Sequence, residues 1–183
     1  MADGASREPA PRRSSKPALV SIRRAAAPDA PAIKALIDRY VGTGALLPRT
    51  TTFIADHAHD FSVAVDDRGT IVGCVHLEEY APSLAEIRSL TVAPDWQGHG
   101  VGRSLVTAAE RLARIRSYAT VFAVSNIGPF FTGLGYRQRH IPELNRERSA
   151  VSKFKGVYAK DMKEPRSSRK DPASISGWNI FDS

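Results

Sequence analysis

The chain alternates between two hydrophobic periods, and each change of period marks the boundary of a structural element. Residues 19–24 have the composition of a strand. A helix is expected from Pro28-Asp29 onward, because apolar residues then recur at the three- and four-residue spacing of one helix face. These residues are Ile33, Leu36, Ile37 and Tyr40. A second, weaker helix is expected over about residues 50–59.

Period-two alternation returns after these helices and predicts a hairpin and a further strand. Residues 61–65 and 70–77 are the two arms of the hairpin, and the Asp-Asp-Arg-Gly sequence at 66–69 is its turn. The next strand is expected over residues 84–92, where Pro94-Asp95 follows and ends it.

A long helix follows, with apolar residues spaced by +4, +3, +4 and +3 so that they form one buried stripe. The stripe consists of Val101, Leu105, Ala108, Leu112 and Ile115. A strand at 120–124, a short helix at 128–134, and closing strands from Tyr136 and over 156–161 complete the pattern. The order β-α-α-β-β-β-α-β-α-β-β predicts an α/β domain with a mixed sheet over residues 19–162.

The composition bears on the number of domains and on the kinds of partner. The 183 residues are 42% apolar and 25% charged, which fits one globular domain. Residues 1–18 are rich in Pro, Ser and Arg and predict a disordered basic arm, and residues 163–183 predict a polar C-terminal tail. The net charge is +7, of which the two tails hold three. A positive balance predicts attraction to polyanions, and leaves nucleic acid, an anionic cofactor and a carboxylate substrate open.

The single cysteine, Cys74, excludes an internal disulfide and predicts a reducing, cytoplasmic location. Cys74 lies in an expected buried strand, which favours a core residue over a nucleophile. No apolar run approaches the ~20 residues of a membrane span, and the N-terminus lacks the apolar segment of a secretory signal. We therefore expect no membrane partner.

The segment between the strand at 84–92 and the long helix carries the clearest chemistry. Residues 97–103 read Gln-Gly-His-Gly-Val-Gly-Arg. Glycines let a backbone approach an anion closely, and the N–H groups of a first helical turn bind phosphate oxygens. A Walker loop would need a lysine where Arg103 stands, with another spacing, and a dinucleotide fingerprint would need glycine at Leu105. We interpret the segment as an anion cradle; the alternative is an ordinary glycine-rich turn.

These residues resemble the GCN5-related N-acetyltransferases. Residues 86–94, Glu-Ile-Arg-Ser-Leu-Thr-Val-Ala-Pro, followed by the glycine segment, resemble the strand and signature of that family. Residues 130–136, Phe-Phe-Thr-Gly-Leu-Gly-Tyr, resemble its later aromatic element. The resemblance covers about residues 20–161. It implies a mixed, mostly antiparallel sheet flanked by helices, with a splayed central strand pair that binds acetyl-CoA and no metal. The residues implied in cofactor binding are Leu90, Thr91, Val92, Gln97, Gly98, His99, Gly100, Val101, Gly102, Arg103 and Phe131.

Within the family, the chain is most similar to short N-acetylglutamate synthase-like enzymes. Residues 44–50, Gly-Ala-Leu-Leu-Pro-Arg-Thr, resemble a loop of those synthases, and a form without their kinase-like domain is expected. The resemblance implies acetylation of the α-amine of an acidic amino acid, glutamate first, at the first step of arginine biosynthesis. Implied substrate-binding residues are Arg49, Arg88, Asn126 and Lys153. Lys153 stands where the synthases usually carry arginine.

Glu86 matches the strand glutamate that acts as general base in family members. An attacking amine must be neutral, and a free α-amine is mostly charged at neutral pH, so a base helps. The alternative is a surface glutamate paired with Arg88. The oxyanion is expected at a backbone N–H near residues 90–92, where relatives have a bulge. Many relatives place a tyrosine where Phe131 stands, so the general acid stays unassigned, with Ser125 or a water as options.

Two other functions stay open. One is an acetyltransferase for a polyamine, an antibiotic or a protein amine, and the other is a non-catalytic acyl-CoA-binding module. We reject a metal site at Asp56-His57-x-His59-Asp60, because residues two apart on a helix point in different directions. The expected partner is a small amino-acid substrate and not nucleic acid. The oligomeric state is left open, with a homodimer as one alternative.

Overall fold

The computed structural model describes residues 19–43, 46–144 and 155–162. The predicted arm at 1–18 and the predicted tail at 163–183 lie outside the described residues, and so does Lys153.

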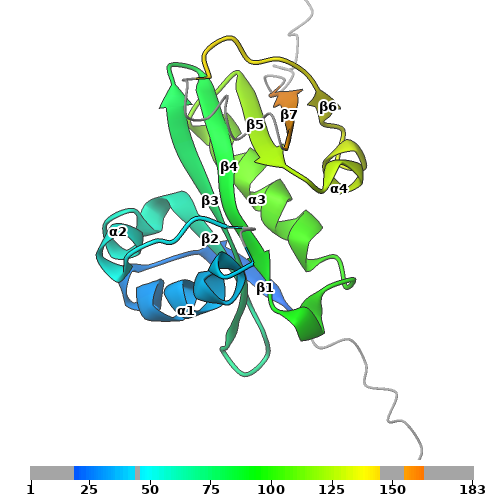
Figure 1. The fold of residues 1–183 in the computed structure, drawn as a ribbon. Helices are drawn as coiled ribbons and strands as arrows, with labels where there is room; N and C mark the ends of the chain where they lie inside the picture. The colour runs from blue at the N-terminus through cyan, green and yellow to red at the C-terminus, as the bar shows by residue number, and fades with distance from the viewer. Residues whose placement is uncertain (1–18, 44–45, 145–154, 163–183) are drawn as a thin grey trace, which may run out of the picture. The chain divides into compact units, whose positions relative to one another are not determined.

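Seven strands form one sheet in the order β1-β2-β3-β4-β5-β7-β6 (Figure 1). β4 and β5 pair in parallel, whereas the pairs β1/β2, β2/β3, β5/β7 and β6/β7 are antiparallel. The strands are β1 (Ser21–Arg24), β2 (Phe61–Val65), β3 (Ile71–Ala81), β4 (Leu84–Val92), β5 (Thr120–Ser125), β6 (Arg137–Gln138) and β7 (Gly156–Asp161). This mixed, mostly antiparallel sheet confirms the predicted fold class.

In the part of the chain that the structure describes, four α-helices and three 3-10 turns lie between the strands in the predicted order. The helices are α1 (Ala30–Val41), α2 (Thr51–Asp56), α3 (Val101–Ile115) and α4 (Gly128–Thr132). The turns are η1 (Ala27–Asp29), η2 (Ala58–Asp60) and η3 (Pro94–Trp96). The predicted bounds of β4 and β7 are confirmed, and β3 continues past its predicted end at residue 77.

The predicted stripe on α3 is wrong at its last member. Ile115 is 73% exposed, whereas Ala109 and Ala113 are buried. At 100° per residue, Ile115 lies roughly 120° around the helix from Ala109, which is the centre of the buried face. The helix therefore buries a face that is rotated from the one that the apolar spacing marks, and this face includes the buried alanines 109 and 113.

The chain divides into two compact units, and β3, β4 and α3 each contribute residues to both. The first unit contains the residues up to His76 together with Arg88–Ala109. The second contains Leu77–Ile87 and the residues from Glu110 onward.

In the first unit, α1 and α2 pack against β2 and the start of β3. Ile33 and Ile37 of α1 and Ile54 of α2 share a buried cluster with Phe61 and Val63 of β2. Behind this cluster Gly73 brings β3 close to α3. A Cβ at Gly73 would lie 2.9 Å from Leu105 Cδ1 and 3.1 Å from the Thr91 carbonyl oxygen, so a larger residue here would force these neighbours to shift.

In the second unit, β5 and β7 form the centre of a separate core. Phe122, Val157 and Ala159 pack with Leu84 and Ile141. A partly buried ion pair ties β7 to α3. Lys160 Nζ donates to Glu110 Oε1 at 2.9 Å and to the Leu134 carbonyl at 2.9 Å, which satisfies charges that would be costly to bury alone.

Among the described residues, no helix is both long enough and apolar enough to span a bilayer.

Candidate active site

The second half of β4 contains a backbone distortion at Ser89. This residue has φ +51, in the left-handed region that strands rarely contain. Its carbonyl oxygen accepts a hydrogen bond from the Thr91 hydroxyl at 3.1 Å and one from the Cys74 thiol at 3.5 Å. Burial raises the pKa of the Cys74 thiol to about 12, so the thiol stays protonated and can donate. The distortion lies directly before Leu90, where the oxyanion N–H is expected.

The end of β4 is fixed by a network around the Val92 carbonyl. The Tyr40 hydroxyl of α1 donates to this oxygen at 2.6 Å, and the Gln97 side-chain amide donates to it at 3.0 Å. Gln97 also donates to the Tyr40 oxygen at 3.1 Å. The Gln97 side chain therefore holds the strand end and the following loop together.

The glycine segment has the backbone that an anion cradle needs. Gly98 has φ +77 and Gly100 has φ +81, and at both positions a Cβ would meet no heavy atom within 4 Å. Between them, His99 turns its Nδ1 to within 2.8 Å of the Gln97 carbonyl oxygen. The two glycines thus present an open stretch of backbone ahead of α3.

α3 begins immediately after this stretch. The Ser104 N–H is the first to join the helical ladder, at 3.0 Å from the Gly100 carbonyl oxygen. The N–H groups of Val101, Gly102 and Arg103 precede it, at the positive end of the helix dipole. Val101 anchors the turn, because its side chain is buried. This arrangement suits a phosphate group.

Arg49 lies in the loop before α2, where its guanidinium stacks on an aromatic side chain. Thr50 caps α2 by accepting the Phe53 N–H at 3.1 Å, and Arg49 Cζ lies 4.9 Å from the centre of the Phe53 ring. Phe53 stacks in turn on His57 at 4.2 Å and meets the buried His76 edge-on at 5.7 Å. These aromatic partners were not predicted from the sequence, although the i, i+4 spacing of Phe53 and His57 signals the first contact.

Arg88 lies on β4 in a half-buried row with Leu90 and Val92, and alternates with the buried Ser89 and Thr91. The predicted cofactor residues of β4 and of the glycine segment, together with Arg49 and Arg88, all belong to the first unit.

Glu86, in the second unit, is completely buried. It stands opposite Phe122 in the parallel register of β4 and β5, which covers Leu84–Glu86 and Thr120–Phe122. The alternative of a surface glutamate is therefore wrong. A fully buried carboxylate on the central strand has the surroundings of a group retained for chemistry or for a specific partner.

Phe131 lies in an aromatic cluster of the second unit. Its side chain is 2% exposed and contacts Phe130 and Tyr136 edge-on, while it stacks on Tyr158 of β7. Asn126, five residues earlier, is exposed. The Ser125 hydroxyl oxygen accepts the Ile127 N–H at 3.1 Å, so Ser125 shapes the turn into α4. Asn126 and Phe131 belong to the same unit as Glu86.

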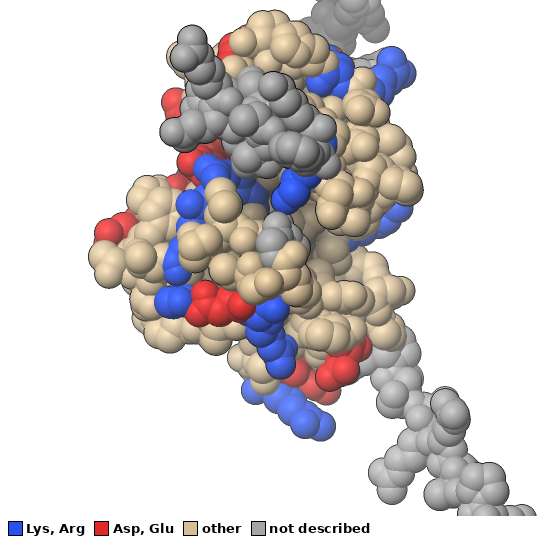
Figure 2. Space-filling model, viewed as in Figure 1, with Lys and Arg blue, Asp and Glu red and all other residues tan. Residues whose placement is uncertain are grey.

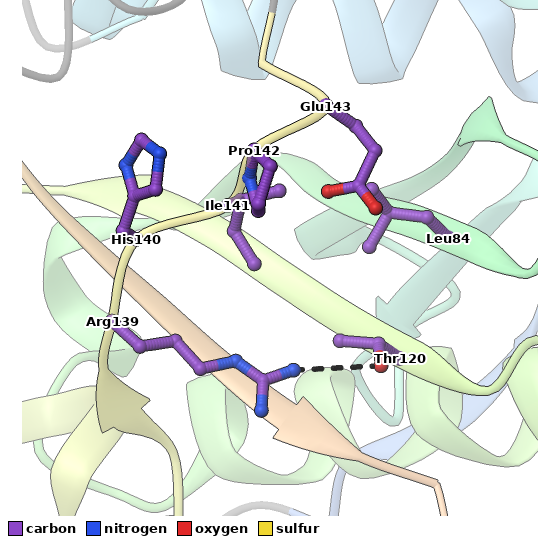
Figure 3. A pocket seen from close by; sticks show the side chains of 7 residues that line it. All are labelled: Leu84, Thr120, Arg139, His140, Ile141, Pro142 and Glu143. Atoms are coloured by element: carbon purple, nitrogen blue, oxygen red, sulfur yellow. Dashed lines mark hydrogen bonds between the residues drawn. The ribbon is translucent and has the colours of Figure 1, made fainter.

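A pocket of about 280 Å³ lies elsewhere in the second unit, and none of the predicted site residues lines it (Figure 3). Its lining includes Leu84, Thr120, Arg139, His140 and Glu143. The Arg139 guanidinium is already engaged by the Asp161 carboxylate at 2.8 Å, and this pairing holds the pKa of Asp161 below its usual value.

Basic side chains do not form one continuous field on the face that Figure 2 shows, where acidic side chains lie among them. Within the described part of the chain, no group of three or more His, Cys, Asp or Glu side chains is placed to hold a metal ion.

Comparison with known proteins agrees with this geometry. The model of the acetyltransferase (GNAT) domain matches residues 56–138. An N-acetyltransferase of Chlorobaculum tepidum, named as uncharacterized, is 37% identical over 117 residues, which cover 64% of this chain and 75% of that protein. An amino-acid acetyltransferase of Mycobacterium tuberculosis is 34% identical over 119 residues, which cover 64% of this chain and 68% of that protein.

Solved structures of acetyltransferases also superpose on this chain. N-acetylglutamate synthase from Neisseria gonorrhoeae, complexed with coenzyme A and N-acetyl-glutamate, superposes with a TM-score of 0.71 at 29% identity. The match covers 82% of this chain and 37% of the synthase, so the chain spans well under half of that protein. A Mycobacterium tuberculosis protein solved with CoA has a TM-score of 0.66 at 27% identity, with 76% of this chain and 97% of that chain covered. The chain therefore belongs to the GNAT family of acetyltransferases, with acetyl-CoA as its co-substrate.

Proposed function

We propose that this chain transfers the acetyl group of acetyl-CoA to the α-amine of an acidic amino acid, with glutamate as the first candidate and the opening step of arginine biosynthesis as its place. The observation that carries the acceptor class is Arg49, whose guanidinium is held on the Phe53 ring in the loop before α2. A planar guanidinium can bind a carboxylate through two parallel hydrogen bonds. The names of the relatives support the same class.

Glu86 acts as the general base in this proposal. As the amine nitrogen attacks the thioester carbon, the C–N bond forms and the nitrogen loses a proton to the Glu86 carboxylate. The C–S bond then breaks, and the electron pair leaves with the CoA sulfur. The Glu86 carboxylate is completely buried on β4, so bulk water does not compete for the proton-accepting oxygen.

The backbone of the first unit holds the co-substrate in this proposal. The left-handed Ser89 turns the strand directly before Leu90, whose N–H is our candidate for the developing oxyanion. The open backbone at Gly98 and Gly100 and the first turn of α3 would receive the CoA pyrophosphate. Tyr40 and Gln97 keep the strand end and the cradle in fixed register.

The acceptor class is tested by Arg49→Ala, with Arg68→Ala as the matched control. Arg68 lies exposed in the hairpin turn of the same unit, so its removal changes net charge equally without touching Phe53. We expect Arg49→Ala to raise KM for glutamate at least ten-fold, because a bidentate carboxylate contact is lost, and Arg68→Ala to leave it within two-fold. An equal KM in both variants would contradict an acidic acceptor and favour another amine.

Glu86→Gln tests the catalytic part separately. The amide keeps the shape of the carboxylate and cannot take the proton, so we expect kcat to fall by roughly 10²-fold or more with CoA affinity unchanged. An unchanged kcat would remove Glu86 from the mechanism. Loss of CoA binding in this variant would assign Glu86 a structural role.

The cytoplasmic location stays a prediction that rests on the lone Cys74.

A further inference from the structure

Ser89 is the residue at which the backbone of β4 leaves the strand conformation. Among the described residues, the other non-glycine residues with positive φ are Ser83 and Ser117, and both lie in turns. Ser89, by contrast, has φ +51 inside a strand and is buried. A non-glycine residue keeps this conformation only where its surroundings hold it there. The contacts that hold Ser89 therefore bear on the site that follows it.

Two side-chain donors hold the Ser89 carbonyl oxygen. The Thr91 hydroxyl donates to it at 3.1 Å from the same strand, and the Cys74 thiol donates to it at 3.5 Å from β3. Both donors are buried, so bulk water does not replace them. Two donors from different strands together fix the direction of this carbonyl group.

The direction of the Ser89 carbonyl also sets the direction of the Leu90 N–H. These two groups belong to one planar trans peptide, in which C=O and N–H point in opposite directions. The Leu90 N–H therefore points away from the donors on Thr91 and Cys74. Donation to the carbonyl oxygen also polarises the peptide group, which makes its N–H a stronger donor. The two side chains thus influence both the direction and the strength of the Leu90 N–H.

We propose that Thr91 is a positioning residue for the oxyanion donor, with the thiol of Cys74 as the second and weaker partner. This inference rests on the proposed acetyl transfer, in which the Leu90 N–H stabilises the developing oxyanion. The Thr91 hydroxyl acts through the peptide between Ser89 and Leu90. A donor that is aimed before the reaction needs no reorganisation as charge develops on the oxygen. All four residues belong to the first unit.

Thr91→Val tests the proposal, because valine keeps the β-branched shape and removes the hydroxyl. The oxyanion forms only when the amine attacks, so a misdirected N–H should lower kcat and leave the Kd of CoA unchanged. We expect kcat with acetyl-CoA and glutamate to fall at least ten-fold, which is part of the roughly 10²–10³-fold cost of removing an oxyanion donor outright. Ser21→Ala is the matched control. The Ser21 hydroxyl donates to the Val65 carbonyl at 3.4 Å in the same sheet, and its loss should leave kcat within two-fold of wild type.

Thr91→Ser separates positioning from packing. Serine keeps the hydroxyl and removes the methyl group, so we expect kcat to stay within three-fold of wild type. If Thr91 only filled space, Thr91→Ser would lower kcat at least as much as Thr91→Val, which keeps the volume.

Three results would overturn the proposal: a kcat within two-fold of wild type for Thr91→Val, an equal loss of kcat in both Thr91 variants, or a loss of kcat matched by an equal rise in the Kd of CoA. Failure of the proposed function is distinguishable, because the wild-type protein would then release no CoA with any amino acid.

Discussion

Replacing Gly100 by alanine separates the cost of backbone strain from the cost of a damaged cradle. Gly100 has φ +81, and an added Cβ would meet no heavy atom within 4 Å. Gly69, in the hairpin turn, has φ +80 and equally open surroundings. The two positions therefore carry the same strain, and only Gly100 belongs to the candidate cradle.

Alanine in the left-handed region costs about 1 kcal/mol relative to glycine. With no steric overlap at either position, Gly100→Ala and Gly69→Ala should each lower the free energy of unfolding by that amount. For a chain of this length the corresponding fall in Tm is about 2–4 °C. Thermal unfolding of the two variants and of the wild type measures this loss of stability, which should be the same in both variants.

CoA binding should distinguish the two variants. A Cβ at Gly100 would occupy the open space through which a phosphate approaches the backbone, so we expect Kd for CoA to rise at least ten-fold, or about 1.4 kcal/mol. Gly69→Ala should bind CoA as the wild type does. Titration calorimetry with CoA gives both values. Equal CoA affinity in the two variants, at equal loss of stability, would refute the assignment of the glycine segment to phosphate binding.

Two further predictions concern titratable groups of the first unit. Burial raises the pKa of Cys74 to about 12, so the thiol of the native protein should resist an alkylating reagent at pH 8 and react only on unfolding in urea. Rapid alkylation of the native protein would contradict the burial of Cys74. The Asp29 carboxylate accepts two hydrogen bonds from Arg23, at 2.7 and 2.9 Å, and one from the Ala26 N–H. The Arg23 bonds are the main reason that the pKa of Asp29 lies below the usual 3.8. The stabilisation is therefore present above the unfolded pKa and is lost as pH falls through the lower folded pKa. Asp29→Asn should cost about 1 kcal/mol at pH 7 in urea unfolding, and a difference from wild type that does not shrink below pH 3.8 would exclude the ion pair as its source.

Local patterns predicted most of the helices and strands, whereas the assignment of the glycine segment as an anion cradle stays a prediction. β4 has the predicted bounds, and its end is set by the proline that follows. α3 begins directly after Gly100, as the glycine segment predicts. Arg49 could be selected from the loop resemblance alone. The contact of Phe53 with His76 could not be predicted, because it depends on tertiary packing between β3 and α2.

The features that sequence reasoning missed depend on contacts between distant segments. The left-handed Ser89 is held by Cys74 from the neighbouring strand, and serine carries no signal for positive φ. The prediction for Ile115 was wrong because it followed the spacing of large apolar residues, whereas the buried face of α3 also includes the small Ala109 and Ala113.

The most direct test of the proposed acetyl transfer is the release of CoA from acetyl-CoA by the purified full chain, measured with each amino acid as acceptor in turn. We predict saturable turnover with glutamate or a close acidic analogue, formation of the N-acetyl product in equal amount, and little turnover with cationic acceptors such as lysine or a polyamine. Turnover with cationic amines alone, or no CoA release with any acidic amino acid or its amide, would contradict the account.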